Sequence, residues 1–132
     1  MADEDKSERW RQGMATRRSV LGAEWVDRAR KNQTDFDAPF QDLITEAAWG
    51  HVWSRDTISK RERSMMTLAL LAGLGNYEEL ALHTRATLNT GCSRDDIREA
   101  MLHVAIYAGV PRANHAIKVI RQVFDEIDGE AQ

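Results

Sequence analysis

The chain has 132 residues, of which 42% are hydrophobic and 30% are charged, a balance typical of one globular domain with a modest core. Its formal net charge of −3 excludes the strongly basic surface that nucleic-acid-binding proteins carry. The longest apolar stretch without charges, residues 64–77, is shorter than the roughly 20 residues that a membrane helix needs. We therefore expect neither nucleic acid nor a membrane as a partner.

The only cysteine, Cys92, cannot form an internal disulfide, which is typical of proteins from reducing compartments. The first residues, MADEDKSERW, are acidic and lack the apolar segment of a signal peptide. We therefore expect a cytoplasmic protein with a single domain over residues 1–132, in which residues 1–7 form a flexible N-terminal tail.

Apolar residues recur every three or four positions along the whole chain, which predicts an all-α fold of about six or seven helices. Ser7 is placed to cap a first helix, and Gly22 interrupts that helix. A second helix is predicted from Ala23 to about Lys31. These two segments form the start of the predicted bundle.

A polar connector at residues 32–37 follows. Asp37 is placed to cap the next helix, and Pro39 in its first turn supports that start. This helix is predicted to end near Gly50, which leaves residues 51–58 as a packed loop.

The second half of the chain carries two capping-box patterns, Ser59 with Glu62 and Ser93 with Asp96. Each precedes a segment rich in apolar residues. Glycines predict where the helices of this half end, and a proline predicts where the last one begins. These residues are Gly75, Gly91, Gly109 and Pro111.

One polar stripe follows the helix predicted after Asn76, where Glu79 and His83 lie four residues apart on the same face as Thr87. Ionisable groups among apolar neighbours often take part in chemistry. The same spacing also describes an ordinary ion pair on a helix surface. Both interpretations of the Glu79–His83 pair stay open at this point.

A second stripe lies on the helix that follows Ser93, where His103 and Tyr107 are the polar exceptions in an otherwise apolar run. A helix that is apolar all round is expected to be central to the fold. We therefore predict a small polar pocket between this helix and the one that carries His83. The alternative is that His103 and Tyr107 are core residues hydrogen-bonded to carbonyl groups.

Other residues are candidates for binding. Arg63 and Arg85 suit a carboxylate ligand, whereas Trp49 and Trp53 either cover the core edge or form the wall of a pocket. Metal binding is not expected, because neither an HExxH motif nor a paired-cysteine motif is present. The residues considered as ligands are His51, His83, His103, His115 and Glu79.

Residues 41–124, in particular the segments EELALHTRA and HVAIYAGVP, resemble the carboxymuconolactone decarboxylase family. The wider superfamily includes alkylhydroperoxidase-type disulfide reductases, which use a CxxC motif followed by a histidine. Here Asn76 and Glu79 match the two cysteines and His83 matches the histidine, while Ser64 matches the glutamate of those peroxidases. Because both reactive sulfurs are missing, the resemblance favours the decarboxylase branch.

The resemblance implies an alkylhydroperoxidase-like helical bundle that assembles as a homo-oligomer, most often a hexamer. It also implies a 4-carboxymuconolactone decarboxylase of the β-ketoadipate pathway, in the protocatechuate branch of aromatic degradation. Such a lyase converts a dicarboxylate lactone to β-ketoadipate enol-lactone and CO2. The lactone itself accepts the electrons, so no cofactor is expected.

The resemblance and the residue chemistry together suggest roles. His83 is expected to donate the proton, with Glu79 orienting its ring or tuning its pKa. His103 and Tyr107 are candidate oxyanion donors, and the substrate-binding candidates are Arg63, Arg85, Trp49 and Trp53. The alternatives are an alkylhydroperoxidase-like antioxidant protein and a non-catalytic helical assembly protein.

Overall fold

A computed structural model describes residues 2–131 of the chain. Seven α-helices, one 3-10 helix and one π-helix make up the regular structure of these residues, so the predicted all-α fold is confirmed. The chain forms two compact units, Met1–Ile58 and Ser59–Gln132, and the single-domain assignment stays a prediction. Within the described part, no helix is both long enough and apolar enough to cross a membrane.

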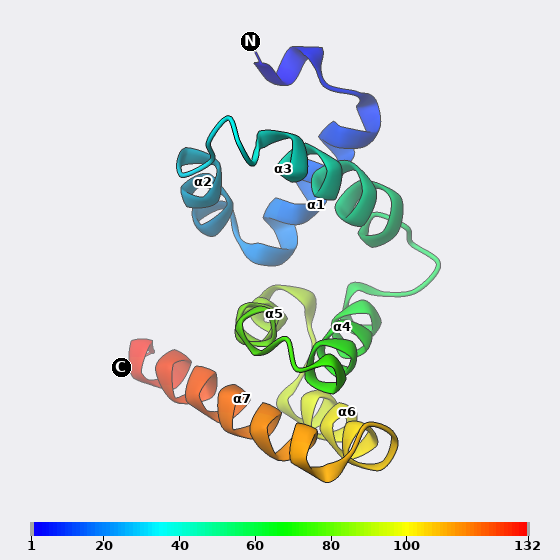
Figure 1. Ribbon diagram of the computed structural model, residues 1–132, viewed down its shortest axis with the longest axis vertical. Helices are drawn as coiled ribbons and strands as arrows, with labels where there is room; N and C mark the ends of the chain where they lie inside the picture. The colour runs from blue at the N-terminus through cyan, green and yellow to red at the C-terminus, as the bar shows by residue number, and fades with distance from the viewer. Residues whose placement is uncertain (1, 132) are drawn as a thin grey trace. The chain divides into compact units, whose positions relative to one another are not determined.

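The first unit begins with the 3-10 helix η1 (Ala2–Asp5) and continues through α1 (Glu8–Leu21) and α2 (Ala23–Lys31). After a connector, α3 (Ala38–Ile44) runs directly into the π-helix η2 (Thr45–Trp53) (Figure 1). Helix α1 packs most extensively against η2. The predicted starts of α1 and α2 are confirmed, and the Ser7 side chain accepts a hydrogen bond from the Trp10 amide.

Two glycines let α1 and η2 approach closely. A Cβ atom on Gly13 would lie 2.0 Å from the Thr45 carbonyl oxygen, and one on Gly50 would lie 2.6 Å from the Arg9 carbonyl oxygen. Real Cβ atoms do not come this near to backbone oxygens. The absence of both side chains therefore sets the distance between the two helices.

The prediction for the end of this unit was wrong in two respects. The helical path continues past Gly50 as a π-helix to Trp53 instead of ending in a loop. Asp37 makes no capping bond to α3; its Oδ1 atom accepts hydrogen bonds from the amide and hydroxyl of Thr34. It therefore closes the connector before the helix, as an aspartate in a turn often does.

The predicted N-terminal tail makes contacts within the first unit. Asp3 accepts a hydrogen bond from Arg30 at 2.8 Å, and Lys6 pairs with Asp42 at 2.8 Å. Met1 lies outside the described residues. The flexibility of residues 1–7 stays a prediction.

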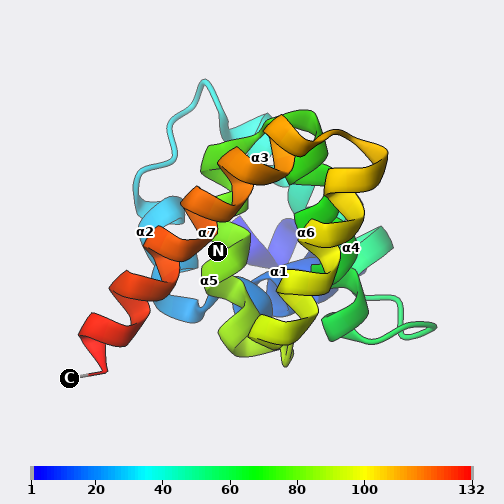
Figure 2. The same cartoon turned by 90° about the horizontal axis from the view of Figure 1, so that it is seen from below.

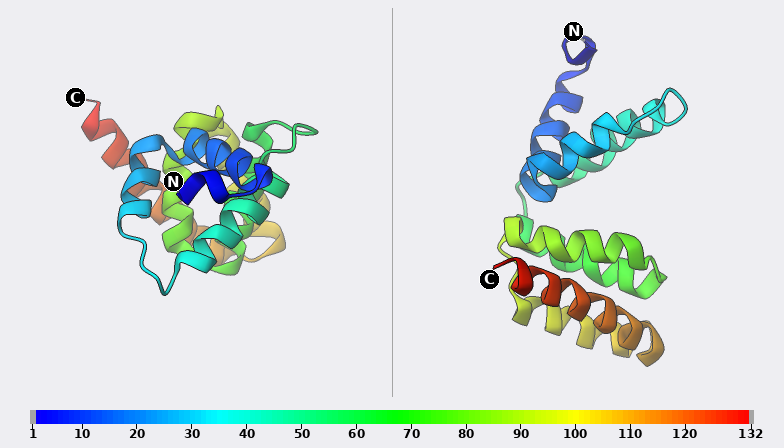
Figure 3. Two further views of the ribbon diagram at one scale, coloured as in Figure 1. Left: turned by 90° about the horizontal axis from the view of Figure 1, so that it is seen from above. Right: turned by 90° about the vertical axis from the view of Figure 1, so that its left-hand side faces the viewer.

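The second unit is built from two helical hairpins. Helices α4 (Lys60–Leu74) and α5 (Tyr77–Thr90) form the first, and α6 (Arg94–Tyr107) and α7 (Val110–Glu130) form the second. Figure 3 shows the two hairpins as two layers. Helix α4 packs on α5, α6 and α7, and α7 packs on all three other helices. The core between the layers includes Leu68, Ala72, Leu80, Ile97, Met101, Ala116 and Ile120.

The predicted ends of these helices are confirmed. Both capping boxes form, at Ser59 with Glu62 and at Ser93 with Asp96. Gly75 and Gly91 end α4 and α5 in the left-handed region, with φ angles of 77° and 79°, which glycine adopts at no steric cost.

The helix with His103, which was expected to be central to the fold, contributes Ile97 and Met101 to the core but leaves one face uncovered. The side chains of Leu102, Ile106 and Tyr107 are 55%, 77% and 79% exposed. Helix α6 packs against α4 and α7, and these two neighbours leave one of its faces uncovered. An apolar helix need not be enclosed by its own chain, because a second molecule can cover the remaining face.

Candidate functional site

His83 lies in the middle of α5 and is mostly buried, whereas Glu79 one turn earlier is exposed. Burial lowers the pKa of the His83 imidazole from 6.5 to about 4, because a charged ring loses solvation there. Burial, and not the Glu79 carboxylate, is the cause of this shift, and the role of Glu79 in orienting the ring or tuning its pKa stays a prediction. His83 is therefore neutral at pH 7 in the free protein.

This lowered pKa predicts how stability depends on acidity. His83 binds a proton less readily in the folded protein than in the unfolded chain. It therefore stabilises the folded state fully above pH 6.5, and this stabilisation is lost as the pH falls toward 4. We expect a loss of roughly 2–3 kcal/mol over that interval. In urea unfolding, His83→Gln should show a shallower decline in unfolding free energy between pH 7 and pH 4 than the natural protein. Parallel declines would contradict the prediction.

A seam of buried hydroxyl groups, which sequence reasoning missed, lies between α4 and α5. The Ser64 hydroxyl donates to the Thr90 hydroxyl at 2.7 Å, and both side chains are buried. Thr84 and Thr87 are also buried and donate to backbone carbonyls of α5. The signal was the repeat of threonines every three residues along α5. Ser64, at the position of the peroxidase glutamate, thus makes a structural hydrogen bond.

Arg63 lies at the start of α4 and is 9% exposed. It is therefore buried, whereas an arginine close to a helix start is usually solvated. The Ser64–Thr90 bond sets the register of the antiparallel α4–α5 pair. In this register Arg63 and His83 are separated by about 12 Å along the helix axes. A long side chain can span much of such a distance. Arg63 and His83 thus occupy one helical hairpin.

Arg85 points away from this region. Its two guanidinium Nη atoms donate to Glu130 at 2.9 and 3.1 Å, and it also pairs with Glu126 at 3.5 Å. Residues two apart on a helix face nearly opposite directions, so Arg85 does not share the face of α5 that carries His83. Its ion pairs instead connect α5 to the end of α7.

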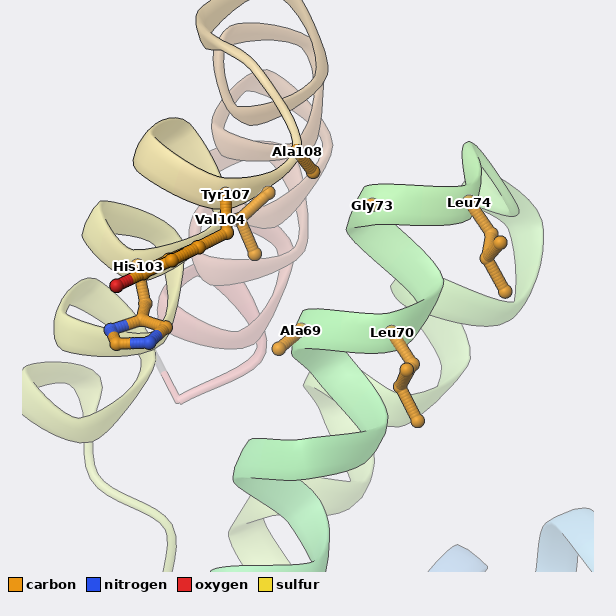
Figure 4. Close-up of a pocket in the computed structure, with 8 residues that line it drawn as sticks. All are labelled: Ala69, Leu70, Gly73, Leu74, His103, Val104, Tyr107 and Ala108. Atoms are coloured by element: carbon orange, nitrogen blue, oxygen red, sulfur yellow. The ribbon is translucent and has the colours of Figure 1, made fainter.

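His103 and Tyr107 lie together on α6, with ring centroids 4.8 Å apart. They line a groove of about 340 Å³ against α4, where Ala69 faces Val104 (Figure 4). Both side chains are exposed. Helix α5 is not among the helices that pack extensively on α6, so the predicted polar pocket between these two helices is not formed within one chain.

Trp49 and Trp53 lie on η2 in the first unit, where they are buried and their ring centroids are 5.1 Å apart. Trp53 follows Trp49 by four residues, and both side chains form part of the interior of the first unit. Their predicted role in binding substrate stays a prediction.

The thiol and the histidines show no redox or metal arrangement. Cys92 is buried, and this burial raises the pKa of its thiol to about 11, so the reactive thiolate is scarce at neutral pH. Among the described residues, no group of three or more potential ligands is placed to hold a metal ion.

Comparison with known proteins decides the family. A model of the carboxymuconolactone decarboxylase family matches residues 38–122. The chain belongs to this family. It is 40% identical over 120 residues to a 4-carboxymuconolactone decarboxylase of Acinetobacter baylyi, covering 91% of this chain and 90% of that one. The expected family is therefore confirmed.

Two other relatives extend this comparison. A nitrosuccinic acid decarboxylase of Metarhizium robertsii is 42% identical over 116 residues, which cover 88% of this chain and 81% of the relative. A 4-carboxymuconolactone decarboxylase sequence of Pseudomonas putida is 44% identical over 46 residues, which cover 35% of this chain and 96% of that sequence. Relatives named as decarboxylases thus support a decarboxylase in this chain.

Proposed function

We propose that this protein is a 4-carboxymuconolactone decarboxylase that releases CO2 and forms β-ketoadipate enol-lactone in protocatechuate degradation. The observation that carries the proposal is the 40% identity to the Acinetobacter baylyi enzyme over 91% of the chain. The presence of His83 and Arg63 on one helical hairpin supports it.

The proposed reaction uses the substrate as its own electron acceptor. The carboxylate that leaves is attached to the ring carbon next to the lactone oxygen. Its bonding electrons move through the ring double bond to the lactone carbonyl and form a dienolate. A proton is then added to the ring carbon next to that carbonyl. The protein must bind two carboxylates, stabilise the dienolate and supply this proton.

His83 is the proposed proton donor, although its ring is neutral in the free protein because burial lowers its pKa to about 4. A bound dicarboxylate brings negative charge to the site, which favours the imidazolium form. Substrate binding is therefore coupled to proton uptake in this mechanism. Glu79 remains a candidate for orienting the ring.

Arg63 is the better placed of the two proposed carboxylate ligands, because it is buried on the hairpin that carries His83. Arg85 is already engaged with Glu126 and Glu130. We therefore propose that Arg63 binds a substrate carboxylate and that Arg85 contributes less to substrate binding. A water-poor site around Arg63 strengthens its interaction with a carboxylate.

We also propose that the site is completed in a homo-oligomer, most simply a hexamer. The uncovered face of α4 and α6 includes Leu70, Leu74 and Ile106, which are 64%, 67% and 77% exposed. Such apolar surface is typical of a protein-protein contact. A second copy that covers it would also enclose His103 and Tyr107, the proposed oxyanion donors.

Light scattering tests this assembly. We expect a molar mass several times 15.0 kDa at micromolar concentration, because burying this apolar face stabilises the contact. Ile106→Glu should shift the protein toward smaller species by placing a charge in the contact. Glu99→Gln, an exposed change on the same helix, is the control. A natural protein that stays at 15.0 kDa would overturn the proposal.

An activity assay tests the reaction itself. Incubation with the lactone should release CO2 and change the ultraviolet absorbance, while a parallel peroxide assay should show no turnover, because two cysteine positions are occupied by Asn76 and Glu79. Nitrosuccinate is the second substrate to test, given the 42% identity to the Metarhizium robertsii enzyme. Turnover of nitrosuccinate alone would replace the lactone with that substrate, and turnover of peroxide alone would overturn the proposal.

A further inference from the structure

A groove between α6 and α7 combines an apolar floor with a cationic end. It encloses about 480 Å³, a size typical of small-molecule sites. Figure 2 looks onto these two helices. The floor includes Ile97, Met101 and Ile120, which are 2–3% exposed. Three arginines are among the described residues that line the groove: Arg94, Arg98 and Arg121. Asp128 and Asp95 pair with the first two.

The charged and apolar residues are separated along the groove. Helices α6 and α7 are antiparallel because a short turn at residues 108–109 joins them. Arg94 and Arg98 precede Leu102 on α6, and Ile117 precedes Arg121 on α7. The three arginines therefore gather at one end, and Leu102 and Ile117 lie at the other. From Arg94 to Leu102 the groove is about 12 Å long.

Two features prepare the cationic end for an anion. The Arg94 guanidinium carbon lies 4.1 Å from the centroid of the Phe124 ring, and its Nη atoms donate to Asp128 at 2.7 and 3.2 Å. These contacts hold the Arg94 group in place, although Asp128 also compensates part of its charge. Within residues 2–131, Arg121 makes no hydrogen bond or ion pair, so all its donors are available to a ligand.

Arg98, the third arginine, can exchange its present partner for a ligand with little loss of stability. Arg98 pairs with Asp95 on its own helix at 2.7 Å, and both side chains are largely exposed, at 66% and 85%. Such a pair contributes little stability. A ligand carboxylate can therefore take the place of Asp95 without a large penalty.

The charge of the groove argues against a second copy as its occupant. A two-fold contact through this face would bring Arg121, which has no carboxylate partner among the described residues, close to the same residue of the second copy, and like charges disfavour such a contact. We propose that the groove binds an amphipathic carboxylate, with its charged group at the three arginines and its apolar body along Met101, Leu102 and Ile117. This site is separate from His83, and the proposal does not rest on the proposed function.

A titration followed by amide NMR spectra of the full chain tests the proposal. Octanoate should shift the signals of α6 and α7 amides near the groove, whereas octyltrimethylammonium, with the same chain and opposite charge, should not. A parallel titration with 4-phenylbutanoate distinguishes alkyl from aryl acids as the source of the ligand. Equal shifts with octanoate and octyltrimethylammonium would overturn the proposal.

Two matched variants locate the carboxylate. Arg121→Gln and Lys118→Gln each remove one positive charge from an exposed position of α7, but only Arg121 lines this groove. We expect Arg121→Gln to raise the octanoate dissociation constant about tenfold, the effect of one charge-assisted hydrogen bond, and Lys118→Gln to change it less than about twofold. Equal effects of the two variants would overturn the proposal.

Another variant tests the apolar end and the competing occupant. Leu102→Asn should weaken octanoate binding and leave the shifts caused by the shorter butanoate unchanged, since butanoate does not reach that end. The molar mass should stay the same when octanoate is added. A fall in molar mass on addition of octanoate would show that a second copy occupies the groove and would overturn the proposal.

Discussion

His83→Ala should lower turnover of the lactone by roughly 10²–10⁴-fold, the range expected for loss of a general acid. His83 is the mostly buried histidine of α5, and a dicarboxylate bound beside it would raise its low pKa. The measurement is steady-state turnover at pH 7, accompanied by circular dichroism and light scattering. These two controls check that the variant is folded and assembled like the natural protein.

Two variants separate proton donation from other roles of this side chain. His83→Gln retains hydrogen bonding but cannot supply a proton at neutral pH, so it should lose nearly as much activity as His83→Ala. Glu79→Gln should cost less and leave the pH profile nearly in place, because burial and not this carboxylate sets the pKa of His83. A large displacement of the profile by Glu79→Gln would contradict that cause.

His103→Ala is the comparison variant on α6, in the second helical hairpin. The His103 ring is exposed and stacks on Tyr107, so its loss should affect dienolate stabilisation only where a second copy completes the site. If His103→Ala abolished turnover while His83→Ala retained most of it, the proton donor would lie on α6. The assignment of His83 would then be wrong.

Local sequence rules predicted most of the helix boundaries, because the signals act within a few residues. The capping boxes at Ser59 and Ser93 and the left-handed glycines Gly75 and Gly91 each satisfy backbone groups of their own helix. The π-helix was not predictable in this way. Its continuation past Gly50 accompanies a close approach to α1, and α1 is far away in the sequence.

The candidate site was harder to predict for the same physical reason. Helical periodicity places Glu79 and His83 on one stripe of α5, but it does not say which helix lies opposite. Two antiparallel hairpins put α4 beside both α5 and α6, so His103 was wrongly paired with the α5 stripe. The ion pairs of Arg85 with α7 are also long-range contacts. The family resemblance supplied the chemistry, which periodicity alone could not.

Gly13→Ala should destabilise the protein by about 3 kcal/mol or more, the upper part of the range for overpacking. The added methyl group would lie 2.0 Å from the Thr45 carbonyl oxygen and 2.8 Å from the Gly50 amide nitrogen. Both are backbone atoms, so no side chain can rotate to make room. Helix α1 must therefore move away from η2, which loosens the interior around Trp49.

Gly129→Ala is the matched control for this prediction. It is the same substitution inside a helix, but an added Cβ at Gly129 meets nothing within 4 Å. Alanine is the better helix former by up to about 1 kcal/mol, so this variant should be neutral or slightly more stable. Urea unfolding monitored by tryptophan fluorescence measures both changes. Equal stabilities of the Gly13→Ala and Gly129→Ala proteins would show that α1 and η2 do not depend on the close approach at Gly13.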